Sequence, residues 1–328
     1  MDFHLISYSL LSFLLLFVCA KISYKFKLVD LPSERKIHSD ETVYTGGVAI
    51  SFSYILSILI FDIADNFNLI LSMAFLVSII GLIDDKFNLN VGGKLSLQIF
   101  PIFYLIIFQD LALISLGDYN YFKLNLGSFA LPFSLICTLF LINAFNYFDG
   151  TDGTLSFSSV SVLGILYFLV PNQEFQLYLV IILIPLGFFI CFNFSLLRLP
   201  KMFLGDSGSL LLGFIISFIL IYLANQNLVH PIILAWSIVI FVYEFLSINL
   251  IRLKKNQNPF VPGTDHLHHE LFKKTKSIFF TNLTITLLNV ILFLIGYLSF
   301  IFISPLVAFI LFILLFLIFL FLRNKYSY

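Results

Sequence analysis

Charged side chains are scarce in this 328-residue sequence, in which Asp, Glu, Lys and Arg make up only 11% of the residues. Soluble domains carry about 25% charged residues, so the composition argues against an ordinary soluble protein. Hydrophobic residues make up 60% of the chain, which is enough for about ten membrane helices of ~20 residues each. The sequence therefore predicts an all-α fold, a polytopic helical bundle embedded in a membrane.

Cysteine is also rare. The three cysteines, Cys19, Cys137 and Cys191, all lie in apolar runs, and the sequence contains no Cys-x-x-Cys pair. Cysteine in apolar surroundings usually behaves as a small hydrophobic residue. We therefore expect neither a disulfide framework nor a zinc site. An excess of charge of one sign is absent too, since 18 basic residues balance 18 acidic residues. The net charge therefore says nothing about a nucleic-acid partner, and we expect none.

About eleven apolar runs are long enough to cross a bilayer, for which a helix needs about 20 residues. They cover residues 3–24, 47–63, 67–83, 95–110, 131–147, 155–171, 177–194, 209–225, 230–251, 279–299 and 303–322. Because Met1-Asp2-Phe3-His4 carries no basic residue, the first run is interpreted as a retained helix rather than a signal peptide. We expect one membrane-embedded domain over residues 1–328.

The basic residues predict the orientation in the membrane. Seventeen of the eighteen follow odd-numbered runs, and only Lys123 follows an even-numbered one. Cytoplasmic loops of membrane proteins carry an excess of Lys and Arg. The loops after odd-numbered runs are therefore expected in the cytoplasm, with the N-terminus outside and the C-terminus inside.

Five polar clusters interrupt the apolar runs. They comprise residues 30–38 with Gly46-Gly47, Asp84-Asp85 with Lys94 and Gln98, residues 143–153, residues 201–209 and residues 262–269. Between consecutive clusters lie 36 to 52 residues, enough for two crossings. Two crossings return the chain to the same side, so we expect all five clusters to meet at the cytoplasmic face.

The clusters bring together five carboxylates, Asp84, Asp85, Asp149, Asp152 and Asp206. Two carboxylates ~5 Å apart repel by roughly 3 kcal/mol, so such a group requires a cation. Oxygen ligands without cysteine suit a hard ion such as Mg²⁺, bound through one or two carboxylates and substrate phosphates. Nearby glycines, lysines, arginines and histidines can approach or neutralise phosphate groups. This combination at a membrane surface favours phosphoryl transfer to or from a lipid phosphate.

Several of these residues also have a structural explanation. Asp206 can cap a helix while binding a metal, and Asn143 and Asn146 can bridge neighbouring helices. Glu244 lies inside the ninth apolar run, where an ionisable side chain is a functional candidate by default. Pairing with Tyr243 or with a neighbouring helix would explain Glu244 equally well.

Four motifs with apolar runs between them resemble those of a known family. They are GLIDDKFNLNVGGKLSLQ at residues 81–98, NAFNYFDGTDG at 143–153, FLGDSGSLLLGF at 203–214 and HLHH at 266–269. In this combination and order they are similar to the motifs of the polyprenyl-phosphate N-acetylhexosamine-1-phosphate transferases, which start cell-surface glycan synthesis on a lipid carrier. The resemblance covers residues 30–269 and implies a bundle of ten or eleven spans with a cytoplasmic active-site groove.

The resemblance implies roles for individual residues. Asp84 and Asp85 would lie near the lipid phosphate, with Asp84 as its base, and Lys94 would contact phosphates. Asp206 would be catalytic and, together with Asn146, would hold Mg²⁺. The expected substrate-binding residues are Asn143, Asp149, Asp152, Phe203, His266, His268 and His269, with the basic Arg35 and His38 added to them.

The implied reaction is attack by undecaprenyl phosphate on the β-phosphate of a UDP-N-acetylhexosamine, which releases UMP and leaves a lipid-linked sugar diphosphate. Its cofactor would be Mg²⁺ or Mn²⁺, its setting the lipid bilayer of a bacterial inner (plasma) membrane, and a homodimer is left open. The segments 35–38 and 266–269 resemble the branch that uses UDP-GlcNAc or related amino sugars. The peptidoglycan branch, which uses UDP-MurNAc-pentapeptide, is the alternative.

One position departs from the family pattern. Many members carry a basic residue that grips the diphosphate where this chain has Thr264. Candidates to replace it are Arg252, Lys254 and Lys255. A transporter is the alternative from another class, but transporters place their polar residues near the middle of the bilayer, whereas here these residues gather in loops on one side.

Overall fold

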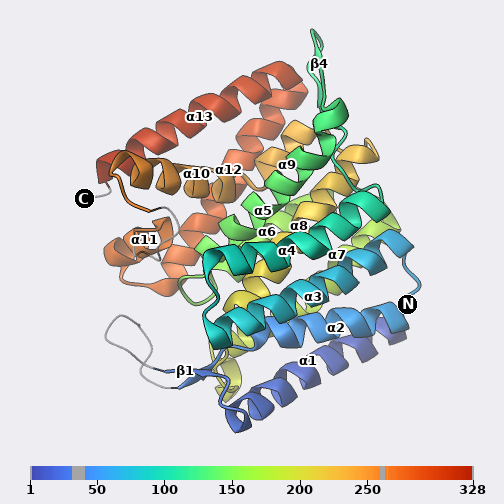
Figure 1. The fold of residues 1–328 in the computed structure, drawn as a ribbon, viewed down its shortest axis with the longest axis vertical. Helices are drawn as coiled ribbons and strands as arrows, with labels where there is room; N and C mark the ends of the chain where they lie inside the picture. Colours follow the sequence, from blue (N-terminus) through green and yellow to red (C-terminus); the bar gives the residue numbers. More distant parts are fainter. Residues whose placement is uncertain (1, 32–40, 259–262, 264, 327–328) are drawn as a thin grey trace. The chain divides into compact units, whose positions relative to one another are not determined.

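The computed structural model describes residues 2–31, 41–258, 263 and 265–326. Helices dominate this part of the chain (Figure 1). They are α1 (Asp2–Lys25), α2 (Gly46–Ile60), α3 (Asp65–Phe87), α4 (Val91–Phe108), α5 (Ala130–Phe148), α6 (Thr154–Leu169), α7 (Gln173–Asn193), α8 (Gly205–Asn225), α9 (Pro231–Ser237), α10 (Val239–Lys254), α11 (Leu267–Thr275), α12 (Ile278–Phe302) and α13 (Pro305–Tyr326). The strands are β1 (Val29–Asp30), β2 (Thr42–Val43), β3 (Ser115–Asp118) and β4 (Lys123–Asn125), which form two antiparallel pairs.

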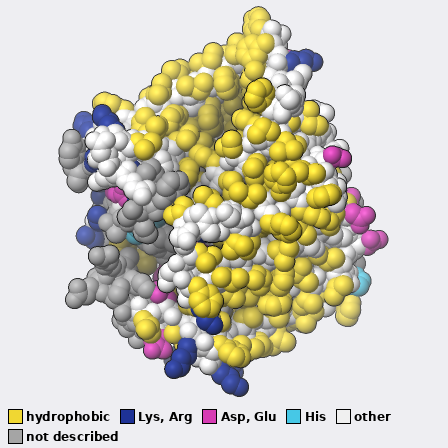
Figure 2. Space-filling model, viewed as in Figure 1, with side chains coloured by type: hydrophobic (Ala, Val, Ile, Leu, Met, Phe, Trp, Pro, Cys, Tyr) yellow, Lys and Arg dark blue, Asp and Glu magenta, His cyan; other side chains and the backbone are white. Residues whose placement is uncertain are grey.

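The helices are apolar on their outer surfaces as well as inside. Phe168 is 84% exposed, Leu59 79% and Phe302 78%. Figure 2 shows hydrophobic side chains spread over the helical surface. A helix that is hydrophobic all round must be covered by protein or by lipid. The chain is therefore a multi-pass membrane protein with an all-α fold, as predicted.

The predicted count of eleven spans is not confirmed. Eight helices in the described part are long and apolar enough to cross a membrane, and nine if α9 and α10 form one bent span. The remaining two predicted runs fold as the shorter apolar helices α2 and α6. The α2 helix stops at Ile60 because Phe61 is extended. Its 15 residues reach about 23 Å, which is less than the ~30 Å hydrocarbon core.

The chain divides into two compact units, each made of two segments. Unit 1 comprises Met1–Gln109 and Pro171–Ile215, and unit 2 comprises Asp110–Val170 and Ile216–Tyr328. The division falls within α8, so this one helix contributes its first half to unit 1 and its second half to unit 2. The expectation of a single domain stays a prediction.

In unit 1, α1, α2, α3 and α4 pack consecutively, and α7 packs on α1 and α2 (Figure 1). The proline in α7, Pro185, has no N–H and cannot donate to the carbonyl of Ile181 four residues earlier. The buried Tyr8 hydroxyl donates to that carbonyl instead, at 3.0 Å. Tyr54 donates to the next carbonyl, that of Ile182, at 3.0 Å. Two tyrosines therefore join α1 and α2 to the proline-containing turn of α7.

In unit 2, α12 packs against α6, α9, α10, α11 and α13. The predicted run 230–251 is not one straight helix, because α9 and α10 meet at a 74° bend. Asn289 of α12 lies at this break: its amide donates to the Ser237 carbonyl at 3.2 Å, and its oxygen accepts from Ile240 N–H at 3.4 Å. Backbone groups freed by a break in a membrane helix require such partners.

Candidate functional site

In unit 1, two carboxylates from different helices share one ammonium group. Asp84 lies in the last turn of α3, Lys94 in the first turn of α4 and Asp206 in the first turn of α8. The Lys94 Nζ lies 2.6 Å from an Asp84 oxygen and forms a second ion pair with Asp206. The Asp206 side chain is the most exposed of the three, at 30%. Three predicted catalytic residues thus form one polar group at the ends of their helices.

The turn between α3 and α4 fixes the spacing of Asp84 and Lys94. The second carboxylate oxygen of Asp84 accepts from Leu89 N–H at 2.9 Å. Asn88 ends α3 in the left-handed conformation, with φ of 50°, which asparagine tolerates better than most residues. Asn90 then caps α4 by accepting from Gly93 N–H at 2.8 Å. The motif residues that carry no charge therefore set the geometry of those that do.

Asp85, predicted as catalytic, contacts the first turn of α8. Its carboxylate accepts from the backbone N–H of Asp206 at 3.1 Å and faces that of Ser207 at 3.5 Å. The first N–H groups of a helix have no partner within the helix, and an anion there is favourable. Asp85 thus caps α8 from another helix and places Asp206 beside Lys94.

Glycines allow α8 to approach α2 and α3 closely. A Cβ on Gly81 would lie 2.4 Å from Ser207 Cα, and one on Gly47 would lie 2.2 Å from Gly208 Cα. The segment before α8 is held in the same way, since Phe203 N–H donates to the Val43 carbonyl at 2.7 Å. Unit 1 therefore brings together parts of three predicted polar clusters. The predicted substrate-binding residues Arg35 and His38 lie outside the described residues.

Tyr44 and Phe203 lie in the segments that lead into α2 and α8, and the Tyr44 carbonyl lies against Gly205 at the start of α8. Burial, with additional repulsion from the carboxylates of Asp85 and Asp30, raises the pKa of the Tyr44 phenol above its ordinary value. Tyr44 therefore stays neutral and can donate a hydrogen bond at physiological pH. The Lys201 ammonium lies 5.3 Å from the centre of the Phe203 ring. Tyr44 was missed by the sequence analysis, although it directly precedes the Thr45-Gly46-Gly47 turn.

In unit 2, the loop between α5 and α6 lies against the histidine segment. A Cβ on Gly150 would lie 2.0 Å from the His268 Nε2, so only glycine fits there. Asn282 of α12 holds the same loop by donating to the Asp152 carbonyl at 2.8 Å and accepting from the Thr154 hydroxyl at 2.7 Å. The two predicted clusters 143–153 and 262–269 therefore meet within this unit. Asn282, in an apolar run, gave no sequence signal.

Burial lowers the pKa of all three histidines, which favours the neutral imidazole. Burial lowers the pKa of His266 to about 4, and it lowers the pKa of His268 well below its ordinary value. Burial and the neighbouring Lys273 lower the pKa of His269. These shifts count against the expectation that the histidines supply positive charge, which stays a prediction. The histidines can instead donate or accept hydrogen bonds as imidazoles.

Two of the buried imidazole nitrogens have no hydrogen-bond partner within the described part of the chain. They are the Nδ1 of His266 and the Nε2 of His268, in side chains that are 8% and 1% exposed. The two rings are nearly parallel, with centroids 5.6 Å apart, and Tyr147 packs on His266 at 5.0 Å. Buried polar atoms without partners are uncommon. These two face groups of the chain itself: the His268 Nε2 lies against Gly150, and the His266 Nδ1 lies 4.0 Å from the Glu244 carboxylate.

The amide residues of α5 differ in what they contact. Asn143 donates to the Leu139 carbonyl of its own helix at 2.7 Å, which is a structural contact. Asn146 lies three residues after Asn143 and therefore on the same face of α5. The backbone carbonyl of Asn146 accepts a hydrogen bond from Asp149 N–H at 3.2 Å. Asn146, Asp149 and Asp152 stay predicted site residues.

The departure at residue 264 also lies outside the described residues. Of the candidates to replace the missing basic residue, Arg252 forms a two-bond ion pair with Asp265, at 3.0 and 2.6 Å. Arg252 is therefore committed to the histidine segment. Lys254 and Lys255 lie exposed at the end of α10.

Comparison with known proteins agrees with the resemblance. Residues 67–224 match the family described as glycosyl transferase family 4. The chain is 31% identical over 307 residues to the undecaprenyl-phosphate alpha-N-acetylglucosaminyl 1-phosphate transferase of Yersinia pestis, covering 91% of this chain and 84% of the relative. It is 31% identical over 281 residues to the enzyme of the same name from Escherichia coli K12, covering 82% and 76%. The chain belongs to glycosyl transferase family 4.

Proposed function

We propose that this protein transfers N-acetylglucosamine-1-phosphate from UDP-GlcNAc to undecaprenyl phosphate, releases UMP and so begins lipid-linked glycan synthesis. Two relatives carry this acceptor and this sugar in their names and align with most of the chain. The observation that carries the proposal is the Asp84–Lys94–Asp206 group. It offers carboxylates and an ammonium for a lipid phosphate and a nucleotide diphosphate at the ends of membrane helices.

We further propose that the reaction requires Mg²⁺ or Mn²⁺, with Asp206 and Asn146 as the predicted protein ligands. The donor set fits, because the Asp84 and Asp206 carboxylates already converge on one cation, the Lys94 ammonium. Among the described residues no three or more His, Cys, Asp or Glu side chains form a closed metal cage. Mg²⁺ is commonly bound through one or two carboxylates and substrate phosphates. When bound, the ion would offset charge on the donor diphosphate.

The residues of the chain have distinct parts in this proposal. Asp84 accepts the proton of the lipid phosphate, whose oxygen attacks the β-phosphorus while the bond to the UMP oxygen breaks. Lys94 offsets the negative charge that gathers on the phosphates. The neutral histidines donate hydrogen bonds to the sugar or the diphosphate. Asp85 keeps the first turn of α8 in place.

The proposed orientation in the membrane is based on the distribution of basic residues in the sequence. We propose that the loops rich in Lys and Arg face the cytoplasm, where soluble UDP-sugars are made, with the N-terminus outside and the C-terminus inside. The charged group Asp84–Lys94–Asp206 of unit 1 lies at helix ends rather than mid-span. This position favours an enzyme acting at the membrane surface over a transporter.

The test is direct. Membranes that contain the protein are incubated with undecaprenyl phosphate and each of a panel of radiolabelled UDP-sugars, including UDP-GlcNAc and UDP-MurNAc-pentapeptide. The proposal expects lipid-soluble label from UDP-GlcNAc, release of UMP, and loss of both products in EDTA with recovery on adding Mg²⁺. If only UDP-MurNAc-pentapeptide gave lipid-soluble label, this compound would be the donor in place of UDP-GlcNAc. The absence of label from every donor would refute the proposed transfer reaction. Full activity in EDTA would refute the proposed requirement for a metal ion.

A further inference from the structure

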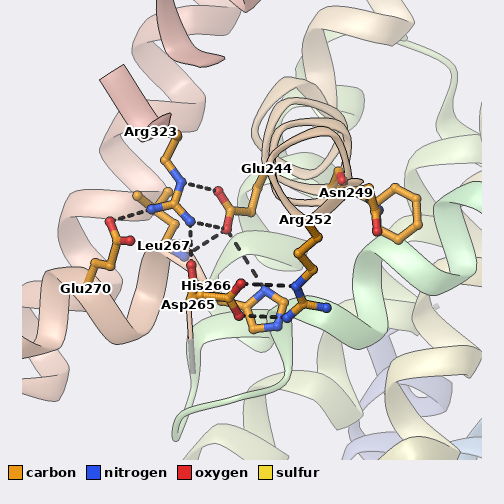
Figure 3. Close-up of polar contacts among 9 residues, drawn as sticks. Glu244, Asn249, Arg252, Asp265, His266, Leu267, Glu270 and Arg323 are labelled. Carbon is orange, nitrogen blue, oxygen red and sulfur yellow. Dashed lines mark hydrogen bonds and ion pairs between the residues drawn. The ribbon is translucent and has the colours of Figure 1, made fainter. Parts of the chain in front are cut away.

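Glu244 and Arg323 form a buried ion pair between the helices α10 and α13 (Figure 3). Glu244 is 1% exposed and Arg323 is 4% exposed. The Arg323 Nε donates to one carboxylate oxygen at 2.9 Å and its Nη2 to the other at 2.8 Å. Such a parallel pair of charge-assisted bonds fixes the orientation of both side chains.

Both partners also bond to the backbone of the histidine segment. The Glu244 Oε1 accepts from Leu267 N–H at 2.8 Å, and the Arg323 Nη2 donates to the Asp265 carbonyl at 2.7 Å. Leu267 is the first residue of α11, and the residue before it, His266, makes no side-chain cap. Glu244 therefore supplies the cap that this helix lacks. Arg323 also forms an ion pair with Glu270 in the first turn of α11.

A second ion pair holds the same segment from the other side, as Figure 3 shows. Arg252 binds the Asp265 carboxylate through two bonds, while Arg323 binds the carbonyl of that residue. The His266 Nδ1 stands 4.0 Å from the Glu244 carboxylate. The peptide groups on both sides of His266 are therefore fixed by side chains from α10 and α13.

Burial of these charges is unfavourable in itself. Desolvation of a buried ion pair can outweigh its Coulomb energy, so such a pair is a poor way to gain stability alone. Helices as apolar as α10 and α13 could pack without it. What apolar packing cannot supply is a set of bonds to the two residues that flank His266, namely Asp265 and Leu267.

We propose that Glu244 and Arg323 are positioning residues that hold the histidine segment 265–269 in its binding conformation. The last membrane helix, α13, thus acts on the site through its final turn. The proposal rests on the proposed function only where it assigns the UDP-sugar to the histidines. The placement of the segment can be tested without any substrate.

The first experiment measures how accessible the histidines are. Purified protein is treated with diethyl pyrocarbonate, and carbethoxylation of His268 is followed by mass spectrometry, with the exposed His4 as internal reference. In Arg323→Met, His268 is expected to react several-fold faster than in the unaltered protein. Arg323→Lys keeps the charge and should give a smaller increase. Lys325→Met removes a basic but exposed side chain from the same helix end, and should give none.

The second experiment separates positioning from general stability. Glu244→Gln keeps an acceptor for Leu267 N–H but loses the charge. In this variant and in Arg323→Lys, the KM for the UDP-sugar is expected to rise about tenfold, as for the loss of one or two ligand hydrogen bonds. The KM for undecaprenyl phosphate should stay unchanged.

The outcomes are distinct. If His268 reacts equally in the unaltered protein, Arg323→Met and Arg323→Lys, the positioning role is overturned. It is also overturned if only the melting temperature falls, or if both KM values rise together. If the unaltered protein transfers no sugar phosphate from any donor, the proposed function fails, and the labelling of His268 still decides the positioning role.

Discussion

The Asp84–Lys94–Asp206 group holds two negative charges and one positive charge, so it keeps a net attraction for a further cation. Two residues hold Asp206 in place: Asp85 accepts a hydrogen bond from its backbone N–H, and Lys94 binds its carboxylate. Its position therefore depends little on its own charge. The isosteric change Asp206→Asn removes the charge and leaves the helix cap from Asp85 in place.

We expect Asp206→Asn to lower turnover by about 100-fold or more, the usual effect of losing one group that stabilises charge in a transition state. The amount of protein in the membrane should not change. The measurement is lipid-soluble label per unit of protein. Asp118→Asn provides the control, because that carboxylate is exposed and pairs with Lys123 in a hairpin. Near-normal turnover in Asp206→Asn would remove this residue from the site.

The histidine segment carries a pH dependence with a defined sign. The pKa of His266 is about 4 in the folded protein because of burial, and about 6.5 in an unfolded chain. Between these values the unfolded chain binds more protons, so stability rises with pH. The contribution of neutral His266 is complete above pH 6.5 and is lost as the pH falls from 6.5 towards 4.

The melting temperature in detergent is therefore expected to fall between pH 7.5 and pH 5. In His266→Gln this fall should be smaller, because glutamine does not titrate. His4→Gln changes an exposed histidine and should show the same fall as the unaltered protein. Identical pH profiles for His266→Gln and the unaltered protein would contradict the buried, neutral state of this imidazole.

At the scale of elements, the break between α9 and α10 depends on one side chain from α12. Asn289 bonds to Ser237 and Ile240 on the two sides of the bend, and to the Ser161 hydroxyl of α6 at 3.1 Å. Asn289→Leu would remove both side-chain bonds to the backbone at the bend, and a buried backbone group that loses its partner costs about 1–3 kcal/mol. We expect a clearly lower melting temperature in detergent.

Asn249→Leu is the matched control for this substitution. Among the residues that the structure describes, the Asn249 amide donates to the Phe245 carbonyl of its own helix, at 2.7 Å, and that carbonyl keeps its place in the α-helical ladder without it. The melting temperature of Asn249→Leu should stay close to that of the unaltered protein. Equal melting temperatures for Asn289→Leu and the unaltered protein would show that Asn289 does not support the bend.

For the whole molecule, local patterns predicted the elements and long-range contacts decided the rest. Each apolar run coincides with a helix or with the pair α9–α10, because apolar composition alone makes a segment helical in lipid. The bend, by contrast, depends on Asn289, about fifty residues away. The short helix α11 was missed because it has only nine residues and a polar composition.

Some residues of the candidate site could be predicted from local sequence patterns, and others could not. Asp84, Lys94 and Asp206 lie in recognisable motifs, and their meeting within unit 1 could be predicted. Arg323 lies 79 residues from Glu244, at the end of an apolar helix. There a basic residue is expected for orientation alone, so no local pattern distinguished it from Lys325.

The orientation of the chain in the membrane is the remaining prediction at this scale. Asn227, in the loop before α9, and Lys254, at the end of α10, both belong to unit 2 and are exposed. The basic residues after α10 predict that Lys254 is cytoplasmic and Asn227 is outside. In a background with serine at 19, 137 and 191, we expect Asn227→Cys to react with a membrane-impermeant maleimide in spheroplasts. Lys254→Cys should react only after permeabilisation. If Lys254→Cys alone reacted in sealed spheroplasts, the predicted orientation would be wrong. The loops with the greatest basic charge would then lie outside, on the side that lacks UDP-sugars.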